Sequence, residues 1–153
     1  MRILGFATIV LTALALVPGG AHLLALPNKI DLPQDAYFTA QGVYRGWALL
    51  GAVLLADVAA LIAWAFAARA QRNAFRLALL AGLCLITALV VFFLWTFPAN
   101  QATANWTVVP DDWMALRRDW EFSHAAGAML ELIALVAVTA SVIAAVGSRG
   151  AQR

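Results

Sequence analysis

The chain has 153 residues, of which 64% are hydrophobic and 12% charged. Soluble domains carry about a quarter charged residues, so this composition excludes an ordinary soluble domain and indicates an integral membrane protein. The formal net charge of +2 is small and gives no reason to expect nucleic-acid binding. Cys84 is the single cysteine, which excludes an intramolecular disulfide and a thiol relay.

Four apolar stretches are each long enough to cross a hydrocarbon core of about 30 Å. In chain order they are residues 3–26, 42–68, 75–97 and 120–146. The connections between them are too short to hold a soluble domain. The sequence therefore predicts one all-α domain over residues 1–153, a bundle of four transmembrane helices in a lipid bilayer.

The positions of the basic residues predict how the chain is oriented, because short cytoplasmic loops collect Lys and Arg. One side is marked by six arginines: Arg2, Arg69, Arg72, Arg76, Arg149 and Arg153. Both termini are then predicted to be cytoplasmic, with the first and third connections on the outer side. The chain is rich in Arg and poor in Lys, which favours a bacterial source and therefore the bacterial inner membrane.

The first apolar stretch holds a histidine beside helix-breaking residues. Pro18, Gly19 and Gly20 predict a kinked or unwound turn just before His22. His22 lies about four residues inside the outer end, or roughly 6 Å deep at 1.5 Å per residue. A broken helix beside a histidine is typical of a lined cavity.

The fourth stretch carries a polar stripe formed by Arg117, Glu121, His124 and Glu131. Their offsets of 4, 3 and 7 residues place them on one helical face. Ionisable side chains inside a bilayer are costly and usually functional, so the stripe is the first place to expect a site. Arg117 and Glu121 are spaced as an ion pair, and His124 lies at a depth similar to that of His22.

Two carboxylates are predicted to lie deeper in the bundle. Asp57 and Glu131 are each about 14 residues from the outer ends of their helices, or roughly 20 Å, and can share a layer. Two close carboxylates in an apolar environment cannot both stay ionised, so at least one is expected to hold a proton. The pair is either a proton relay or a buried hydrogen-bonded pair.

Further polar and aromatic residues fall at the outer ends of the helices. Candidates for contact with a substrate are Asn28, Tyr44, Trp47, Asn100 and Trp106. Trp and Tyr at this depth are also the usual anchors at the membrane interface. These aromatic residues either anchor the bundle or wall a cavity.

Glu121 and His124 form a Glu-x-x-His motif, a spacing at which both side chains can reach one metal ion. One motif does not support a ferritin-type di-iron site, which needs two. His22, His124 and Glu121 have the composition of a single site for iron or copper. Two readings without a metal stay open: a buried hydrogen-bonding network, and metal-free acid–base catalysis.

Several segments resemble the anthrone oxygenase-like family of small four-helix membrane proteins, most of which are bacterial. The resemblance covers almost the whole chain and is strongest at residues 22–29 (HLLALPNK), 44–47 (YRGW), 105–107 (NWT) and 117–124 (RRDWEFSH). Fungal relatives are associated with oxidising anthrones to anthraquinones. The resemblance implies an oxygenase or oxidoreductase that acts on a lipophilic aromatic molecule, and it transfers no catalytic residue.

The first functional hypothesis is therefore an oxygenase or oxidoreductase with an outward-facing site. His124 acts with His22 as a metal ligand or general base, Glu121 orients His124, and Arg117 and Arg45 stabilise a developing phenolate or enolate. The second hypothesis is a protein without enzymatic activity that binds a lipid, a quinone or another apolar ligand, or that serves as a subunit of a membrane complex. Either protein could form a homo-oligomer.

Overall fold

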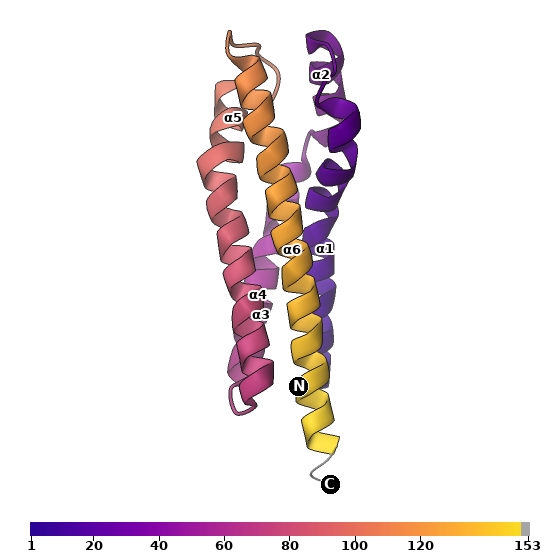
Figure 1. Cartoon of the computed structure of the whole chain (residues 1–153), viewed down its shortest axis with the longest axis vertical. Helices are drawn as coiled ribbons and strands as arrows, with labels where there is room; N and C mark the ends of the chain where they lie inside the picture. Colours follow the sequence, from indigo (N-terminus) through magenta and orange to yellow (C-terminus); the bar gives the residue numbers. More distant parts are fainter. Residues whose placement is uncertain (151–153) are drawn as a thin grey trace.

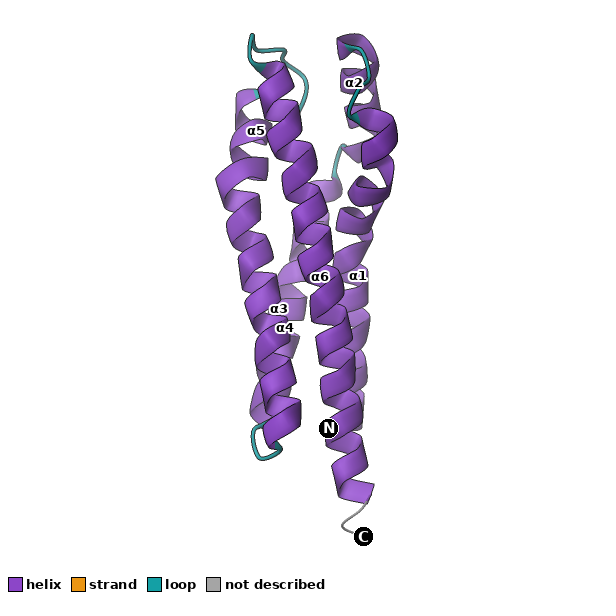
Figure 2. Ribbon diagram, in the orientation of Figure 1, coloured by secondary structure: helices purple, strands orange, loops and turns teal. Residues whose placement is uncertain are grey.

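A computed structural model describes residues 1–150, with side chains to residue 147, so Arg153 lies outside the described residues. The described part of the chain consists of helices and the turns between them (Figures 1 and 2). The elements are α1 (Arg2–Lys29), α2 (Gln34–Gln41), η1 (Gly42–Tyr44), η2 (Trp47–Leu50), α3 (Gly51–Ala68), α4 (Arg72–Val91), η3 (Phe92–Thr96), α5 (Phe97–Ala102) and α6 (Trp113–Gly150). Two of the short elements, η1 and η2, are 3-10 turns, whereas η3 is a π-helical turn.

Four helical segments are long and apolar enough to cross a membrane, which confirms the predicted number of spans. They are Arg2–Lys29, Trp47–Ala68, Arg72–Ala102 and Trp113–Gly147. Both termini lie at the lower end in Figure 1, and α2 and α5 lie near the upper end. We call the upper end the outer end; which side of a membrane it faces stays a prediction.

The second span begins later than its hydropathy predicts. Gly46 has a φ of +88°, a left-handed conformation that glycine adopts without steric cost, and it separates η1 from η2. Helix therefore resumes at Trp47 and not at Gly42. The third span continues past Phe97 through α5. The fourth begins at Trp113, so it includes the charged residues 117–119, which hydropathy assigns to the loop.

The first helix is not unwound before His22, because α1 stays helical through Pro18 and Pro27 to Lys29; a kink at Pro18 stays a prediction. The bundle tolerates a helix that contains two prolines because α1 packs closely against α6 at Gly19. A Cβ atom at Gly19 would lie 2.8 Å from Oε2 of Glu131 and 3.4 Å from Ala128, so the glycine brings α1 directly against α6. Close packing of this kind compensates for backbone hydrogen bonds lost at proline.

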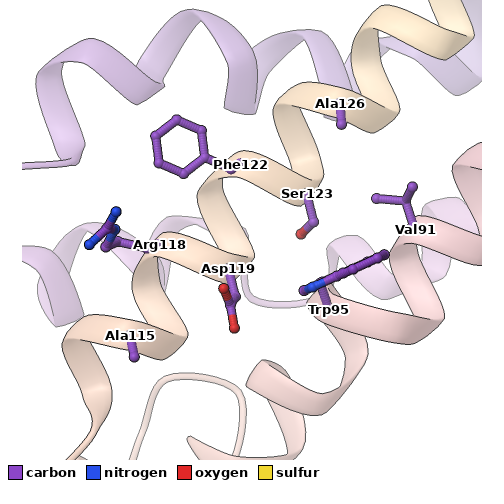
Figure 3. Close-up of a pocket in the computed structure, with 8 residues that line it drawn as sticks. All are labelled: Val91, Trp95, Ala115, Arg118, Asp119, Phe122, Ser123 and Ala126. Carbon is purple, nitrogen blue, oxygen red and sulfur yellow. The ribbon is translucent and has the colours of Figure 1, made fainter.

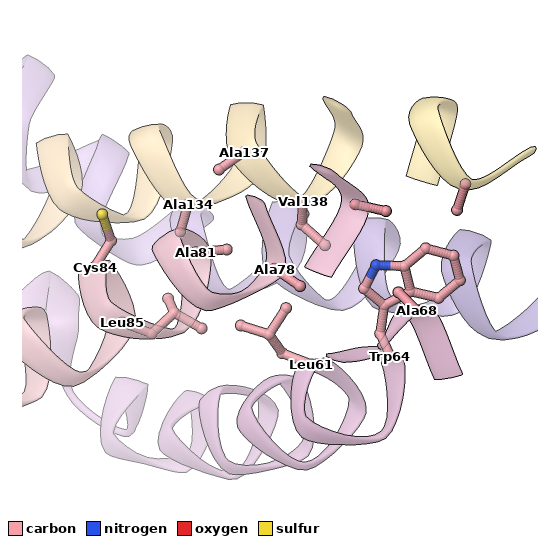
Figure 4. Close-up of a cluster of buried hydrophobic side chains, with 12 residues drawn as sticks. Leu61, Trp64, Ala68, Ala78, Ala81, Cys84, Leu85, Ala134, Ala137 and Val138 are labelled. Carbon is pink, nitrogen blue, oxygen red and sulfur yellow. The ribbon is translucent and has the colours of Figure 1, made fainter. Parts of the chain in front are cut away.

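The inner half of the bundle is a core of small side chains that let the helices approach closely. It includes Ala74, Ala78, Ala81, Ala134, Ala137 and Ala145, with Cys84 as one more small packing residue (Figure 4). Trp64 is fully buried there and donates from Nε1 to Ser141 Oγ at 2.8 Å, and Ser141 donates to the Ala74 carbonyl at 2.6 Å. The polar side chains that this core lacks gather at the outer end.

Candidate functional site

Eight residues from three parts of the chain meet near the outer end, and we call them the outer cluster. They are His22 and Lys29 of α1, Tyr37 of α2, Tyr44 and Trp47 of the following turns, and Trp120, Glu121 and His124 of α6. The loop after α1 folds back so that α2 and the two 3-10 turns cover the ends of α1 and α6. The cluster is therefore formed by tertiary packing and not by one helix face.

The two histidines pack directly against each other. The ring centroids of His22 and His124 are 4.3 Å apart, and that of Trp120 lies 4.7 Å from His22 and 4.0 Å from His124. Tyr44 and Trp47 cover His22 with centroid distances of 4.2 Å and 5.7 Å. The histidine pair is thus enclosed by aromatic rings, and His22 is only 4% exposed.

The hydrogen bonding of the histidines defines which nitrogen can act as a base. Nδ1 of His124 lies 2.9 Å from the carbonyl oxygen of Trp120, which can only accept, so this nitrogen carries a hydrogen. Nε2 of a neutral His124 ring then holds the lone pair. Nδ1 of His22 is buried and makes no hydrogen bond with the described residues.

A buried ion pair lies beside the histidines. Nζ of Lys29 is 2.9 Å from Oε1 of Glu121, and the two residues are 5% and 1% exposed. The hydroxyl of Tyr37 donates to the same oxygen at 3.0 Å and accepts from Gln41 Nε2 at 2.6 Å. Lys29 also donates to the Tyr44 hydroxyl at 3.3 Å, so one ammonium links α1, α6 and the η1 turn.

Aromatic faces complete the surroundings of Lys29. Its ammonium lies 4.5 Å from the ring centroid of Tyr44 and 4.7 Å from that of Trp120. The ammonium therefore lies over the faces of two aromatic rings, an attractive cation–π arrangement. Burial, with a further contribution from the Glu121 carboxylate, raises the pKa of the Tyr37 phenol above its ordinary value, so Tyr37 remains a donor to Glu121.

The predicted ion pair between Arg117 and Glu121 is wrong, whereas the roles of Arg117 and Arg45 toward a developing anion stay predictions. Arg117 does not pair with Glu121, because Lys29 takes that position; its guanidinium instead donates to the Leu32 carbonyl at 2.8 Å and stacks over Trp113. Arg45 is exposed in the turn between η1 and η2 and makes no hydrogen bond or ion pair with a residue of the outer cluster in the described structure. Lys29 is the cation of the site.

The predicted three-ligand metal site does not form in this structure. Among residues 1–147 there is no group of three or more His, Cys, Asp or Glu placed to hold one metal ion. His22 and His124 do meet, but the Glu121 carboxylate is turned toward Lys29 and Tyr37. The described residues therefore do not fit a resident iron or copper ion.

The predicted substrate contacts divide into three groups. Tyr44 and Trp47 lie against His22, as described above. Asn100 accepts from Trp120 Nε1 at 2.8 Å, and Trp106 packs 5.8 Å from the Trp120 ring, so both support the wall of the cluster. Asn28 is exposed and makes no hydrogen bond with the described residues of the cluster, because the buried position at the end of α1 belongs to Lys29.

Asp57 and Glu131 lie deeper and share the middle of the bundle. Asp57 is fully buried, its Oδ1 accepts from the Thr12 hydroxyl at 2.7 Å, and its carboxyl acts electrostatically on that of Glu131. Oδ2 of Asp57 and Oε2 of Glu131 make no hydrogen bond with the described residues. Each carboxyl therefore has one buried oxygen without a hydrogen bond, and the role of the two as relay or buried pair stays a prediction.

Two pockets flank the outer cluster. One has a volume of about 520 Å³ and lies along α6 beside Trp95 and Phe122 (Figure 3). The other, of about 270 Å³, lies between η2 and α5 and is lined in part by Ala48, Phe97 and Asn100. Neither pocket is lined by His22 or His124, so the histidine pair lies behind the walls of both.

Lys29, Tyr37 and Gln41 belong to the site although their spacing in the sequence predicts no role for them. One signal was present: Lys29 is a basic residue on the side where basic residues are disfavoured. A cation that departs from the charge rule at a helix end is a candidate for a buried ion pair. Tyr37 and Gln41 carry no such signal, because their position depends on how α2 folds back.

The chain matches no family model, no curated protein and no solved structure, so the interpretation of the outer cluster depends on its geometry.

Proposed function

We propose that this chain is an integral-membrane enzyme that removes a proton from a lipophilic phenol or anthrone-like aromatic and so promotes its oxidation by dioxygen. The observation that carries the proposal is the His124 ring, whose Nδ1 is held by the Trp120 carbonyl beside the buried Lys29–Glu121 pair. A base with a defined tautomer next to a desolvated cation is the arrangement that enolate chemistry needs.

Each residue has a stated role in this reaction. Nε2 of His124 takes the proton from the acidic C–H or O–H group, and the Lys29 ammonium stabilises the oxyanion that forms. Glu121, held by Tyr37, keeps the Lys29 ammonium in place. Tyr44, Trp47 and Trp120 supply flat apolar faces suited to an aromatic ring.

Dioxygen is the oxidant, and the reaction balances without a metal. In an anthrone, the methylene carbon loses both hydrogens and becomes a carbonyl with one oxygen atom of O₂. The other oxygen atom leaves as water, so the substrate loses four electrons and O₂ gains four. The enzyme contributes the deprotonation that makes the ring electron-rich enough to react.

The test measures anthraquinone formation and O₂ consumption with anthrone as probe, on the full chain in lipid nanodiscs. Empty nanodiscs give the spontaneous rate. We expect the wild type to exceed that rate, and His124→Gln to lose about 100-fold or more of the excess, the usual contribution of a general base. Arg45→Gln, exposed and outside the cluster, serves as the control and retains activity. A wild-type rate equal to that of empty nanodiscs contradicts the proposal.

The second candidate is a protein that binds a lipid or quinone without turnover. One observation favours it: Lys29, Glu121, Tyr37 and Gln41 bond to one another, as residues of a structural network do. Quenching of tryptophan fluorescence by anthrone or a quinone, without product or O₂ consumption, supports this candidate against the enzyme.

A further inference from the structure

The larger pocket is a groove on the outer half of α6 that the reaction proposed above does not use. Its walls come from Val91 of α4 and Trp95 of η3 on one side, and from Arg118, Asp119, Phe122 and Ala126 of α6 on the other (Figure 3). Its volume of about 520 Å³ lies within the range of small-molecule sites. The π-helical turn η3 forms one rim, and such turns are frequent at functional sites.

Polarity changes along the groove in the direction that crosses the membrane. Arg118 and Asp119 lie near the outer end of α6, whereas Phe122 and Ala126 follow about one and two turns deeper. Phe122 is 54% exposed and Trp95 is 45% exposed. The groove is therefore charged at its outer rim and apolar toward the middle of the bilayer. A phospholipid has the same order of polarity, with a charged headgroup outside and apolar acyl chains inside.

The hydroxyl groups at the floor of the groove already have hydrogen-bond partners within the protein. The hydroxyls of Thr96 and Ser123 lie 2.6 Å apart and bond to each other between η3 and α6. Ser123 also donates to the Trp120 carbonyl at 3.0 Å. Because these hydroxyls are satisfied within the described chain, the unpaired polar groups of the groove are the two charges at its rim and the indole N–H of Trp95.

The two charges at the rim are complementary to a zwitterion. Arg118 and Asp119 are exposed, and their side chains make no hydrogen bond or ion pair with another residue of the described chain. A guanidinium matches a phosphate with paired hydrogen bonds, and a carboxylate accepts from an ammonium. An anionic headgroup without an ammonium would satisfy Arg118 but would be repelled by Asp119.

We propose that this groove binds a zwitterionic phospholipid, with its phosphate on Arg118, its ammonium on Asp119 and an acyl chain along Trp95, Phe122 and Ala126. Phosphatidylethanolamine fits best, because its ammonium has N–H groups for the Asp119 carboxylate and the choline headgroup has none. The site is independent of the outer cluster and of its proposed reaction.

Native mass spectrometry of the detergent-purified full chain tests the proposal. The probes are phosphatidylethanolamine, phosphatidylcholine and phosphatidylglycerol with identical acyl chains. We expect one phosphatidylethanolamine to be retained with roughly tenfold higher affinity than phosphatidylglycerol, as expected for one charge-assisted hydrogen bond. Phosphatidylcholine is expected between the two.

Charge-neutral variants locate the lipid. Arg118→Gln and Asp119→Asn are each expected to weaken phosphatidylethanolamine binding roughly tenfold, and Asp119→Asn to remove the preference over phosphatidylglycerol. The matched controls, Arg45→Gln and Asp112→Asn, change exposed charges at the same end outside the groove and leave binding unchanged. Equal retention of phosphatidylethanolamine and phosphatidylglycerol by the wild type overturns the proposal, as does an equal loss in variants and controls.

Discussion

The ammonium of Lys29 lies 2.9 Å from Oε1 of Glu121, so the last residue of α1 is joined to the outer third of α6 by a buried ion pair. Lys29 also sits where the dipole of α1 favours a positive charge. Because the pair is out of water, removing either partner leaves the other buried without its counter-ion. The contact closes the outer end of the bundle over the two histidines.

Removing one partner of this pair is expected to cost more than removing both. Lys29→Met leaves the Glu121 charge buried without its counter-ion, which should lower the free energy of unfolding by about 3–5 kcal/mol. The double variant Lys29→Met/Glu121→Gln removes both charges and should recover most of that loss. The free energies of unfolding of the wild type, Lys29→Met and the double variant are measured in mixed micelles with increasing dodecyl sulfate. A double variant no more stable than Lys29→Met would show that the pair contributes nothing through its charge.

Tyr37 is expected to resist ionisation at alkaline pH. Burial first, and then the neighbouring Glu121 carboxylate, raise its pKa, so the folded protein keeps the phenol neutral where an unfolded tyrosine loses its proton. In a Tyr44→Phe variant Tyr37 is the remaining tyrosine, and no tyrosinate absorbance should develop through pH 10, about the value of a free tyrosine.

The raised pKa of Tyr37 also determines how the stability of the folded protein changes with pH. Above about pH 10 the unfolded state loses a proton that the folded state keeps, so the contribution of Tyr37 is complete below that pH and declines above it. Tyr37→Phe should remove this alkaline decline. Tyrosinate absorbance that appears near pH 10 in folded Tyr44→Phe protein would contradict the burial of the phenol.

The number of membrane spans could be predicted from the sequence, because hydrophobicity over about 20 residues reports directly on transfer into a bilayer. The stripe of α6 also placed His124 at the level of His22, and the structure brings those rings to 4.3 Å. The first inference depends on hydrophobicity along the chain, and the second depends on the constant rise of an α-helix. Neither requires knowledge of how the helices pack against one another.

The partner of Glu121 could not be predicted in the same way. Spacing favours Arg117 on the same helix, but which cation reaches the carboxylate depends on how α1 ends and how α2 folds over it. Pro27 reads as a helix end in the sequence, yet α1 continues to Lys29 and places that ammonium inside the bundle. Contacts between helices require the tertiary packing that periodicity does not contain.

The orientation in the membrane is predicted from arginine placement and can be measured with single cysteines. In a Cys84→Ala background, Ala70→Cys lies in the turn between α3 and α4, and Asp112→Cys lies just before α6; both positions are exposed. A maleimide that does not cross membranes should label position 112 in intact bacterial cells and position 70 only after the cells are opened. The reverse pattern would invert the topology and place the outer cluster on the cytoplasmic side.

Gly19 and Gly20 offer a matched pair of substitutions that tests the contact between α1 and α6. A Cβ at Gly19 would lie 2.8 Å from Glu131 Oε2, whereas a Cβ at Gly20 would meet nothing within 4 Å. Gly19→Ala should therefore displace the end of the Glu131 side chain and destabilise the bundle by about 0.5–1.5 kcal/mol, the cost of an off-rotamer side chain. Gly20→Ala should be neutral or stabilise by up to about 1 kcal/mol, because alanine favours helix over glycine.

The effect of Gly19→Ala should depend on Glu131, since the atom in conflict is the end of that side chain. In a Glu131→Ala background the added methyl group has room, and most of the loss is expected to disappear. A double-mutant cycle of unfolding free energies measures this coupling. If Gly19→Ala costs the same with and without the Glu131 carboxylate, the conflict lies with Ala128 and the backbone of α6, and the carboxyl of Glu131 is not held against α1.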